Sequence, residues 1–427
     1  MTDDLERIVG DVPGPRTRAL VAPLRAHESR NVTYLGDDFP VFWKSASGAT
    51  VEDVDGNRYI DLTAAFGVAS VGHSNPVVAA AIAEQAATLM HGMGDVHPTP
   101  LRSALLERLG RILPSGLTKA FLATTGSEAV EAALKTAVLA TGKHRFVAYH
   151  GAYHGLSLGA LEVGGNPKFS QPFAPLIADV ALRVDYPDAL TTNAKRALDA
   201  LRAALDPHDD LAAIVVEPIQ GRGGCIVPPD GYLAGLRKYC DARGMLLIFD
   251  EIYTGFGRTG NWFACEHDHT IPDIICIGKA MGGGFPISAA VARTSVMDAW
   301  PASSGEALHT STYLGNPMGC AAALATIGEL ERLALPSRAR ELGELIEKRL
   351  RAMLDHPSVV ALRGRGAMWG LQLRSAAEAD RVVKAALARG VILLQAGPQG
   401  DVLSITPPLV ISALQLHRAL ELLKEVL

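Results

Sequence analysis

The sequence predicts an α/β fold: a large domain with a mostly parallel sheet between helices, and a smaller α+β domain. From about residue 118, short apolar runs alternate with amphipathic helical patterns. These runs are continuously apolar, which is typical of strands buried on both faces of a parallel sheet. Near residue 330 the pattern changes to long charged helices and hairpin-like segments, which favours a separate α+β unit.

The large domain is expected to span residues 65–325. Its apolar runs predict strands at 118–124, 144–150, 211–218, 245–251, 272–278 and 287–293. Amphipathic segments predict helices at 126–142 and 231–244, and both end at a glycine. Glycine is common there because it adopts the left-handed conformation that closes a helix.

The smaller domain is expected to combine both ends of the chain, residues 1–64 and 326–427. Its second part predicts a helix at 336–357, a hairpin at 359–373, a helix at 377–390, strands at 391–396 and 401–405, and a closing helix at 414–427. Residues 41–61 contain an Asp55-Gly56 turn between strand-like segments. Asp-Gly is a strong signal for a tight hairpin turn, so we expect these segments to join the smaller domain.

The composition is that of an ordinary globular protein. The 427 residues are 48% hydrophobic and 20% charged, with a net charge of −5, so we expect no partner among nucleic acids or anionic membranes. The acidic start is not a signal peptide, and the longest apolar runs are too short to span a bilayer. Five cysteines form no CxxC pair, and Cys265, His267 and His269 match no common zinc spacing. We expect reduced thiols, a cytoplasmic location and no bound metal.

Polar residues gather at the predicted strand ends, where ligands bind in sheets of this type. Between a strand and a helix, Gly126 and Ser127 offer free backbone N–H groups and a hydroxyl, which suit a phosphate. After the next strand, the loop YHGAYHG at 149–155 carries aromatic rings that suit stacking on a flat cofactor. Each feature alone is also common in helix caps or in ordinary packing.

Two charged residues stand at the ends of apolar strands. Asp250, in the strand at 245–251, needs a partner such as a protonated ring nitrogen, unless it caps the next turn. Lys279, in CIGKAMGGGFP, either extends its amine to solvent or is a buried nucleophile of lowered pKa. A phosphate cradle, a stacking ring, a carboxylate and a lysine together predict a site for pyridoxal 5'-phosphate (PLP), with Lys279 as the Schiff-base lysine.

The chain resembles the class III PLP-dependent aminotransferases of fold type I over nearly its whole length. The most specific segments are VVEPIQGRGG, LLIFDEIYTGFGRTG, PDIICIGKAMGGGFP and STYLGNP, in the order and with the spacing of the family. The resemblance implies these cofactor-binding positions: Lys279 for the Schiff base, Asp250 for the pyridinium, Gly126 and Ser127 for the phosphate, Tyr153 for stacking, and Glu217 and Ile252 for the lining. It also implies a homodimer in which Thr312 reaches the phosphate of the neighbouring subunit.

The departures from the family concern the substrate. Ser404 stands where many members carry an arginine for the α-carboxylate, and Arg222 stands where others carry a glutamate that neutralises this arginine. Leu156 stands where the 4-aminobutyrate type has a further arginine. Tyr253 replaces a glutamine that bonds the cofactor's phenolic oxygen, a role open to its hydroxyl. Phe66 lies where the family lines its pocket and favours an apolar substrate chain.

Two interpretations of Arg222 follow: it binds a substrate carboxylate, or it faces solvent or a subunit boundary. Two functions also follow. The first is an aminotransferase that moves an amino group from an amine or amino acid to a 2-oxo acid through Lys279. The second is an amino acid or lactam racemase or epimerase of the same fold, in which the proton returns to the same carbon. A catalytically idle binding protein is disfavoured because Lys279 and Asp250 are both present.

Overall fold

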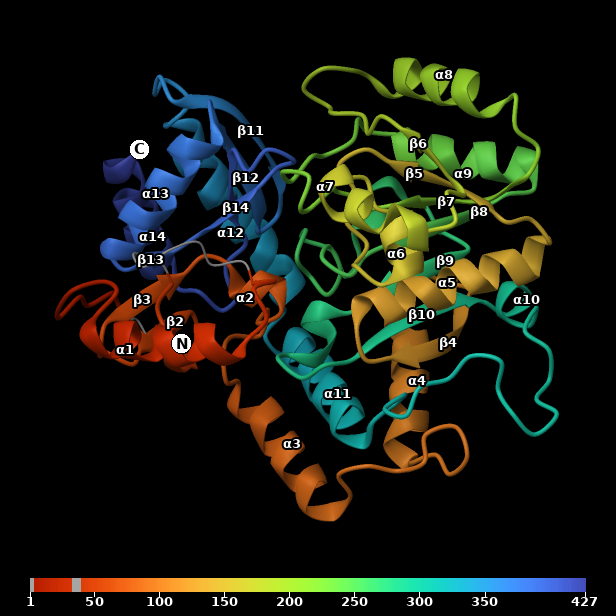
Figure 1. The fold of residues 1–427 in the computed structure, drawn as a ribbon, viewed down its shortest axis with the longest axis horizontal. Helices are drawn as coiled ribbons and strands as arrows, with labels where there is room; N and C mark the ends of the chain where they lie inside the picture. Colours follow the sequence, from red (N-terminus) through yellow and green to blue (C-terminus); the bar gives the residue numbers. More distant parts are fainter. Residues whose placement is uncertain (1–3, 33–39) are drawn as a thin grey trace.

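A computed structural model describes residues 4–32 and 40–427. Within these residues the strands form three sheets, with helices packed around them (Figure 1). The largest sheet has the order β4-β10-β9-β8-β7-β5-β6 and consists of β4 (Leu117–Ala123), β5 (Arg145–Tyr149), β6 (Ala181–Val184), β7 (Leu211–Val216), β8 (Leu246–Asp250), β9 (Ile274–Ile277) and β10 (Ser288–Arg293). Strands β5 to β9 run parallel, whereas β10 is antiparallel to both β4 and β9.

The central strands are buried on both faces, as their continuous apolar sequences require. Every residue of β7 and β9 is buried. Ile214 and Ile275 belong to one hydrophobic cluster, and their neighbours Val215 and Ile274 belong to another, because successive side chains of a strand point to opposite faces. Helix α5 (Gly126–Thr141) covers the second face with small and branched side chains. This is the predicted α/β architecture with a mostly parallel sheet between helices.

The remaining sheets lie together in the red and blue parts of the chain, the two ends of the sequence (Figure 1). One has the order β1-β2-β3-β13 and the other β11-β12-β15-β14. Their strands are β1 (Trp43–Ser47), β2 (Thr50–Asp53), β3 (Arg58–Asp61), β11 (Val359–Arg365), β12 (Met368–Leu373), β13 (Val391–Ile392), β14 (Leu394–Ala396) and β15 (Val402–Ile405). The expected boundaries of the two domains, near residues 64 and 326, stay a prediction.

The segment 391–396 differs from the single strand that its apolar sequence predicted. It forms two short strands that belong to different sheets: β13 pairs in parallel with β3, and β14 pairs antiparallel with β15. The chain therefore passes from one sheet to the other at Leu393, which is buried. Local hydrophobicity does not reveal such a crossing, because no turn residue separates the two halves.

Helices connect and cover the three sheets. The longer ones are α1 (Pro15–His27), α3 (Pro76–Thr88), α4 (Pro100–Ile112), α8 (Ala194–Leu205), α9 (Tyr232–Arg243), α11 (Pro317–Arg332), α12 (Leu335–Arg351), α13 (Ala376–Ala388) and α14 (Ala413–Val426). Short ones are α2 (Ala64–Gly67), α6 (Leu158–Glu162), α7 (Pro167–Ser170), α10 (Thr294–Met297) and the 3-10 turns η1 (Gln171–Leu176), η2 (Ala264–Asp268) and η3 (Lys279–Gly282). Across the described ranges, none of the helices is both long and apolar enough to cross a membrane.

Candidate active site

The carboxyl ends of β5, β7, β8 and β9 lie along one edge of the large sheet, and a cavity of about 560 Å³ opens there. Side chains from both halves of the chain line it. Of the residues singled out in the sequence, these line the cavity: Phe66, Gly126, Ser127, Tyr153, Leu156, Glu217, Arg222, Asp250, Ile252, Tyr253, Lys279 and Ser404. Residues more than 300 positions apart in the chain therefore meet at one site.

Lys279 begins η3 directly after β9, with a left-handed backbone at φ +42°. Such a conformation is strained for a residue other than glycine and is characteristic of functional sites. Burial lowers the pKa of the Lys279 amine, and the charge of Arg222 lowers it further, against Asp250 and Glu217, which raise it. The Nζ atom lies 4.0 Å from the centre of the Tyr253 ring. The amine is thus easier to deprotonate than an ordinary lysine.

Asp250 ends β8 and is buried, with two partners of its own chain. Its Oδ1 accepts a hydrogen bond from the backbone N–H of Ile252 at 3.0 Å, and its Oδ2 lies 2.7 Å from Nδ1 of His154. Burial lowers the pKa of His154, but the hydrogen bond to Asp250 and the charges of Asp250 and Glu217 raise it above its ordinary value overall. Asp250 therefore favours the protonated form of the imidazole beside it.

Glu217 follows β7 and turns its carboxylate toward two backbone N–H groups. Oε1 accepts from Tyr153 at 3.0 Å and Oε2 from Gly221 at 2.9 Å. Burial is the largest influence and raises the pKa of Glu217 to about 6, although the charge of His154 opposes this. Glu217 thus fixes the loop that carries Tyr153 and the loop that carries Arg222.

The turn before α5 is built as an anion site. Thr125 and Glu128 form a capping box at the start of α5, whereas the N–H groups of Gly126 and Ser127 have no preceding helical turn to bond to. A side chain on Gly126 would place Cβ 2.9 Å from Ile252 Cδ1, and one on Gly155 would place it 2.4 Å from Ser127 Cβ. Both glycines are needed for the close approach of these segments.

Tyr253 and Ser404 form another wall of the cavity. The hydroxyl of Tyr253 lies 3.1 Å from Thr406 Oγ1, so its ring rather than its hydroxyl faces Lys279. The expected bond from this hydroxyl to the phenolic oxygen of a cofactor stays a prediction. Ser404 is buried on β15 and interacts with the thiol of Cys225.

Phe66 lies at the opening of the cavity. It belongs to a run of three left-handed residues, Ala64, Ala65 and Phe66, and its side chain is 57% exposed. A Cβ on the next residue, Gly67, would come within 2.4 Å of the Tyr253 ring, so this segment packs tightly on Tyr253. The strained backbone therefore holds an aromatic ring over the entrance.

Thr312 is exposed and lies outside the cavity. The structure of one chain does not bring it to the other predicted residues. Sequence reasoning also assigned no role to His154, although it forms the direct partner of Asp250. The sequence could have indicated a role for His154 through its position in the AYHG loop, next to the tyrosine expected to stack on the cofactor.

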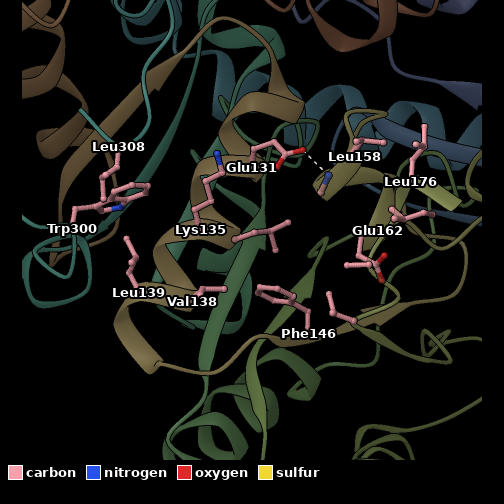
Figure 2. A pocket seen from close by; sticks show the side chains of 15 residues that line it. Glu131, Lys135, Val138, Leu139, Phe146, Leu158, Glu162, Leu176, Trp300 and Leu308 are labelled. Atoms are coloured by element: carbon pink, nitrogen blue, oxygen red, sulfur yellow. Dashed lines mark hydrogen bonds between the residues drawn. The ribbon is translucent and has the colours of Figure 1, made fainter. Parts of the chain in front are cut away.

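A second hollow of about 490 Å³ lies along the outer side of α5 (Figure 2). Its lining is mostly apolar, and its charged side chains already serve structural contacts. Glu131 accepts hydrogen bonds from Ser157 and Gly159, Glu162 accepts from Asp179 and Ala181, and Lys135 lies 3.1 Å from His309. We therefore place the active site in the other cavity.

The donor set of that cavity fits PLP. A helix N-terminus with a serine suits the phosphate, a partly exposed tyrosine suits the ring face, and the remaining lone pairs of Asp250 suit a protonated ring nitrogen. The Lys279 amine of lowered pKa suits an aldehyde. Gly126 and Gly155 keep this region open, because a side chain at position 126 would collide with Ile252 and one at position 155 with Ser127.

Comparisons with known proteins agree with this geometry. The family model described as Aminotransferase class-III matches residues 33–427. The chain is 39% identical to a 4-aminobutyrate aminotransferase of Mycobacterium leprae, over 99% of this chain and 98% of the relative. It is also 39% identical to an acetylornithine aminotransferase of Methanosarcina mazei, over 90% and 91%.

Solved structures show the same fold. An ornithine aminotransferase of Toxoplasma gondii, described with partial occupancy of PLP at its active site, superposes with a TM-score of 0.86 at 30% identity, over 95% of this chain and 93% of that one. This is the expected fold type I, and the comparisons do not favour the racemase alternative. The chain belongs to the class III aminotransferases, the PLP-dependent enzymes that move an amino group from an amine or amino acid to a 2-oxo acid.

Proposed function

We propose that the cavity at the edge of the large sheet is where this aminotransferase works, with Lys279 as the residue that moves the proton. One observation carries the proposal. The Lys279 amine, whose pKa burial lowers, shares a single cavity with the carboxylates of Asp250 and Glu217. A lysine whose pKa is lowered is deprotonated in a larger fraction than an ordinary lysine, and it can therefore act as a base more readily.

When bound, PLP supplies an electron sink for the charge that forms as a proton leaves the substrate carbon. Asp250 keeps the ring nitrogen protonated, and His154 holds the Asp250 carboxylate in place through its Nδ1. Gly126 and Ser127 would hold the phosphate at the start of α5, and Tyr153 and Ile252 would line the space for the ring. Lys279 would bind the cofactor through Nζ, and the same atom would hold the proton that is moved.

The donor is an amine or amino acid with an apolar portion, as the entrance of the cavity suggests. Phe66, Leu156 and Leu394 line the cavity, and both Phe66 and Leu156 are largely exposed to it or to solvent. The names of relatives point to donors with a primary amine, such as 4-aminobutyrate and acetylornithine. The arginine of the 4-aminobutyrate type is replaced here by Leu156, so we do not assign that donor.

A single half-reaction tests the activity. The purified holoenzyme is mixed with one donor amine and no 2-oxo acid, and its absorbance spectrum and the deuterium content of the recovered donor are measured. Conversion to the spectrum of pyridoxamine phosphate supports transfer. Deuterium uptake from solvent without that conversion contradicts it and supports a racemase or epimerase.

We also infer that the active unit is a homodimer in which Thr312 completes the phosphate site of the neighbouring subunit. The segments 89–97 and 308–316 lie together, held by a hydrogen bond from Thr310 to Asp95 of 2.6 Å and a ring contact between His91 and Tyr313. Their exposed side chains form an apolar surface beside Thr312, which supports a covered interface: Met90, Met93, Val96, Leu308 and Tyr313.

Hybrid dimers test this contribution. Lys279→Ala and Thr312→Ala are mixed after dissociation, and transaminase activity is measured at limiting PLP. If Thr312 acts on the neighbouring subunit, each hybrid contains one site with both native residues, and activity returns. If the mixture is no more active than the unmixed variants, the shared site is contradicted.

The five cysteines are free and buried, which is compatible with the cytoplasmic location that we propose.

A further inference from the structure

Arg222 lies on a loop whose backbone is fixed from several sides. Its neighbour Gly221 donates to Glu217 at 2.9 Å, and Gln220 forms a two-way backbone bridge with Ile226. The carbonyl of Arg222 accepts a hydrogen bond of 2.9 Å from Gly397, in the segment that follows β14. Hydrogen bonds to Glu217, which follows β7, and to the C-terminal part of the chain therefore fix the backbone of Arg222.

The guanidinium of Arg222 rests against two aromatic rings. Its Cζ lies 5.1 Å from the centre of the Tyr153 ring and 5.3 Å from that of Phe169, and the two rings meet edge to face at 73°. Contact with ring faces orients a guanidinium and leaves its N–H edge available for a planar anion. Among the described residues, no carboxylate and no hydrogen-bond acceptor engages this side chain.

The position of this unpaired charge relates it to the reaction. Arg222 lines the same cavity as Lys279, and its charge is close enough to help lower the pKa of the Lys279 amine. The cavity's carboxylates, Glu217 and Asp250, are already engaged by backbone N–H groups and by His154. In the part of the chain that the structure describes, Arg222 and Lys279 are the only arginine or lysine side chains that line the cavity.

As far as the structure describes the chain, the wall that carries Ser404 offers no charged side chain in place of the family's arginine. Ser404 is buried and interacts with Cys225, and its neighbours along the cavity, Leu394, Gln395 and Ala396, are uncharged. An aminotransferase must hold the carboxylate of a 2-oxo acid, and a charged, planar donor is the strongest partner for it. One free guanidinium matches one carboxylate.

We propose that Arg222 binds the carboxylate of the substrate and that the preferred acceptor is a 2-oxo acid with a single carboxylate and an apolar side chain. The inference rests on the proposed function of this cavity. A dicarboxylic acceptor would bring a second negative charge for which the described residues of the cavity lining offer no free cation, and burying an unpaired charge is costly. The apolar entrance formed by Phe66 and Leu156 fits the side chain of such an acid.

The first test compares Arg222→Gln and Arg222→Lys with the wild-type holoenzyme. We expect Arg222→Gln to lower kcat/KM for pyruvate by about 10- to 100-fold, mostly through KM, and by at least tenfold more than for a plain amine donor in its half-reaction. Arg222→Lys keeps the positive charge but not the planar guanidinium, so we expect its kcat/KM for pyruvate to lie between those of the wild type and Arg222→Gln. Equal losses for the acid and the amine, or no loss for either, would overturn the proposal.

A binding measurement provides a readout independent of turnover. Propanoate and its uncharged analogue propanamide are titrated calorimetrically into wild-type and Arg222→Gln holoenzyme. The affinity for propanoate should fall by about tenfold or more, whereas propanamide binding should not change. An equal affinity for propanoate in both proteins would assign Arg222 to solvent or to a subunit boundary instead.

Two controls separate this inference from the activity itself. Arg196→Gln removes an exposed arginine from α8, a helix that contributes no residue to the described lining of the cavity, and should behave as wild type. If wild-type enzyme fails to reach the pyridoxamine spectrum with any donor, the proposed function fails. If it does, but prefers 2-oxoglutarate to pyruvate as acceptor, only the monocarboxylate inference is overturned.

Discussion

The contact between Gly155 and Ser127 allows the phosphate site to be tested without removing any of its groups. Gly155 has a left-handed backbone at φ +113°, and an added Cβ would lie 2.4 Å from Ser127 Cβ and 3.0 Å from Ser127 Cα. Real Cβ atoms essentially never approach other atoms at 2.4 Å. The variant Gly155→Ala must therefore displace Ser127 from the start of α5.

Two costs follow from this geometry. The backbone strain of alanine at this φ is about 1–3 kcal/mol. A displaced Ser127 would also lose the charge-assisted hydrogen bond to the phosphate that we propose for it, which would be worth about 1.5–3 kcal/mol. The second cost affects PLP binding alone, so we expect the dissociation constant of PLP to rise by about 10- to 150-fold.

Gly142→Ala is the matched control. Gly142 closes the opposite end of α5, also with a left-handed backbone (φ +67°), but an added Cβ would meet no atom within 4 Å. We expect this variant to lose about 1 kcal/mol of stability and to bind PLP as wild type does. Apoprotein of each variant is titrated with PLP by calorimetry, and its Tm is measured. Equal dissociation constants for the two variants would show that Ser127 does not hold the phosphate.

Three further predictions concern the remaining groups of the site. Borohydride reduction of the holoenzyme should place the pyridoxyl label on the peptide that contains Lys279, and Lys279→Ala should lose both label and activity; a label on another lysine would contradict the assignment. Burial raises the pKa of Glu217 from 4.5 to about 6, so the folded state binds this proton more tightly than the unfolded state. As the pH rises from about 4.5 to above 6, the unfolding free energy of wild-type apoprotein should therefore fall by about 2 kcal/mol relative to that of Glu217→Gln. Chemical denaturation at a series of pH values measures this difference. The raised pKa of His154 has the opposite origin, a stabilising charge pair with Asp250. Relative to His154→Gln, wild-type apoprotein should therefore be most stabilised below pH 6.5 and lose that advantage as the pH rises above it; a constant difference would contradict the charged pair.

Local patterns were sufficient for six of the seven strands of the large sheet; the edge strand β6, Ala181–Val184, was not predicted. The continuously apolar runs that contain β7, β8 and β9 can be satisfied only by strands covered on both faces, and they alternate with helices along the chain. Because the carboxyl ends of parallel strands share one edge, Asp250 and Lys279 could be expected to meet from their positions alone. Together with the phosphate cradle and the stacking ring, these two residues predicted PLP, and the family motifs agreed with that prediction.

The sequence by itself thus determined the α/β class, the strand-end lysine and carboxylate, and the glycines around them, since these follow from short-range periodicity and from residue type. Tertiary structure alone decided which distant groups pair. His154 meets Asp250 across 96 positions, and the buried Arg258 donates to Pro407, which lies 149 positions away. The division of residues 391–396 between two sheets and the aromatic corner that holds Arg222 are of the same kind. Such contacts are fixed by the packing of whole elements, on which the local sequence carries no information.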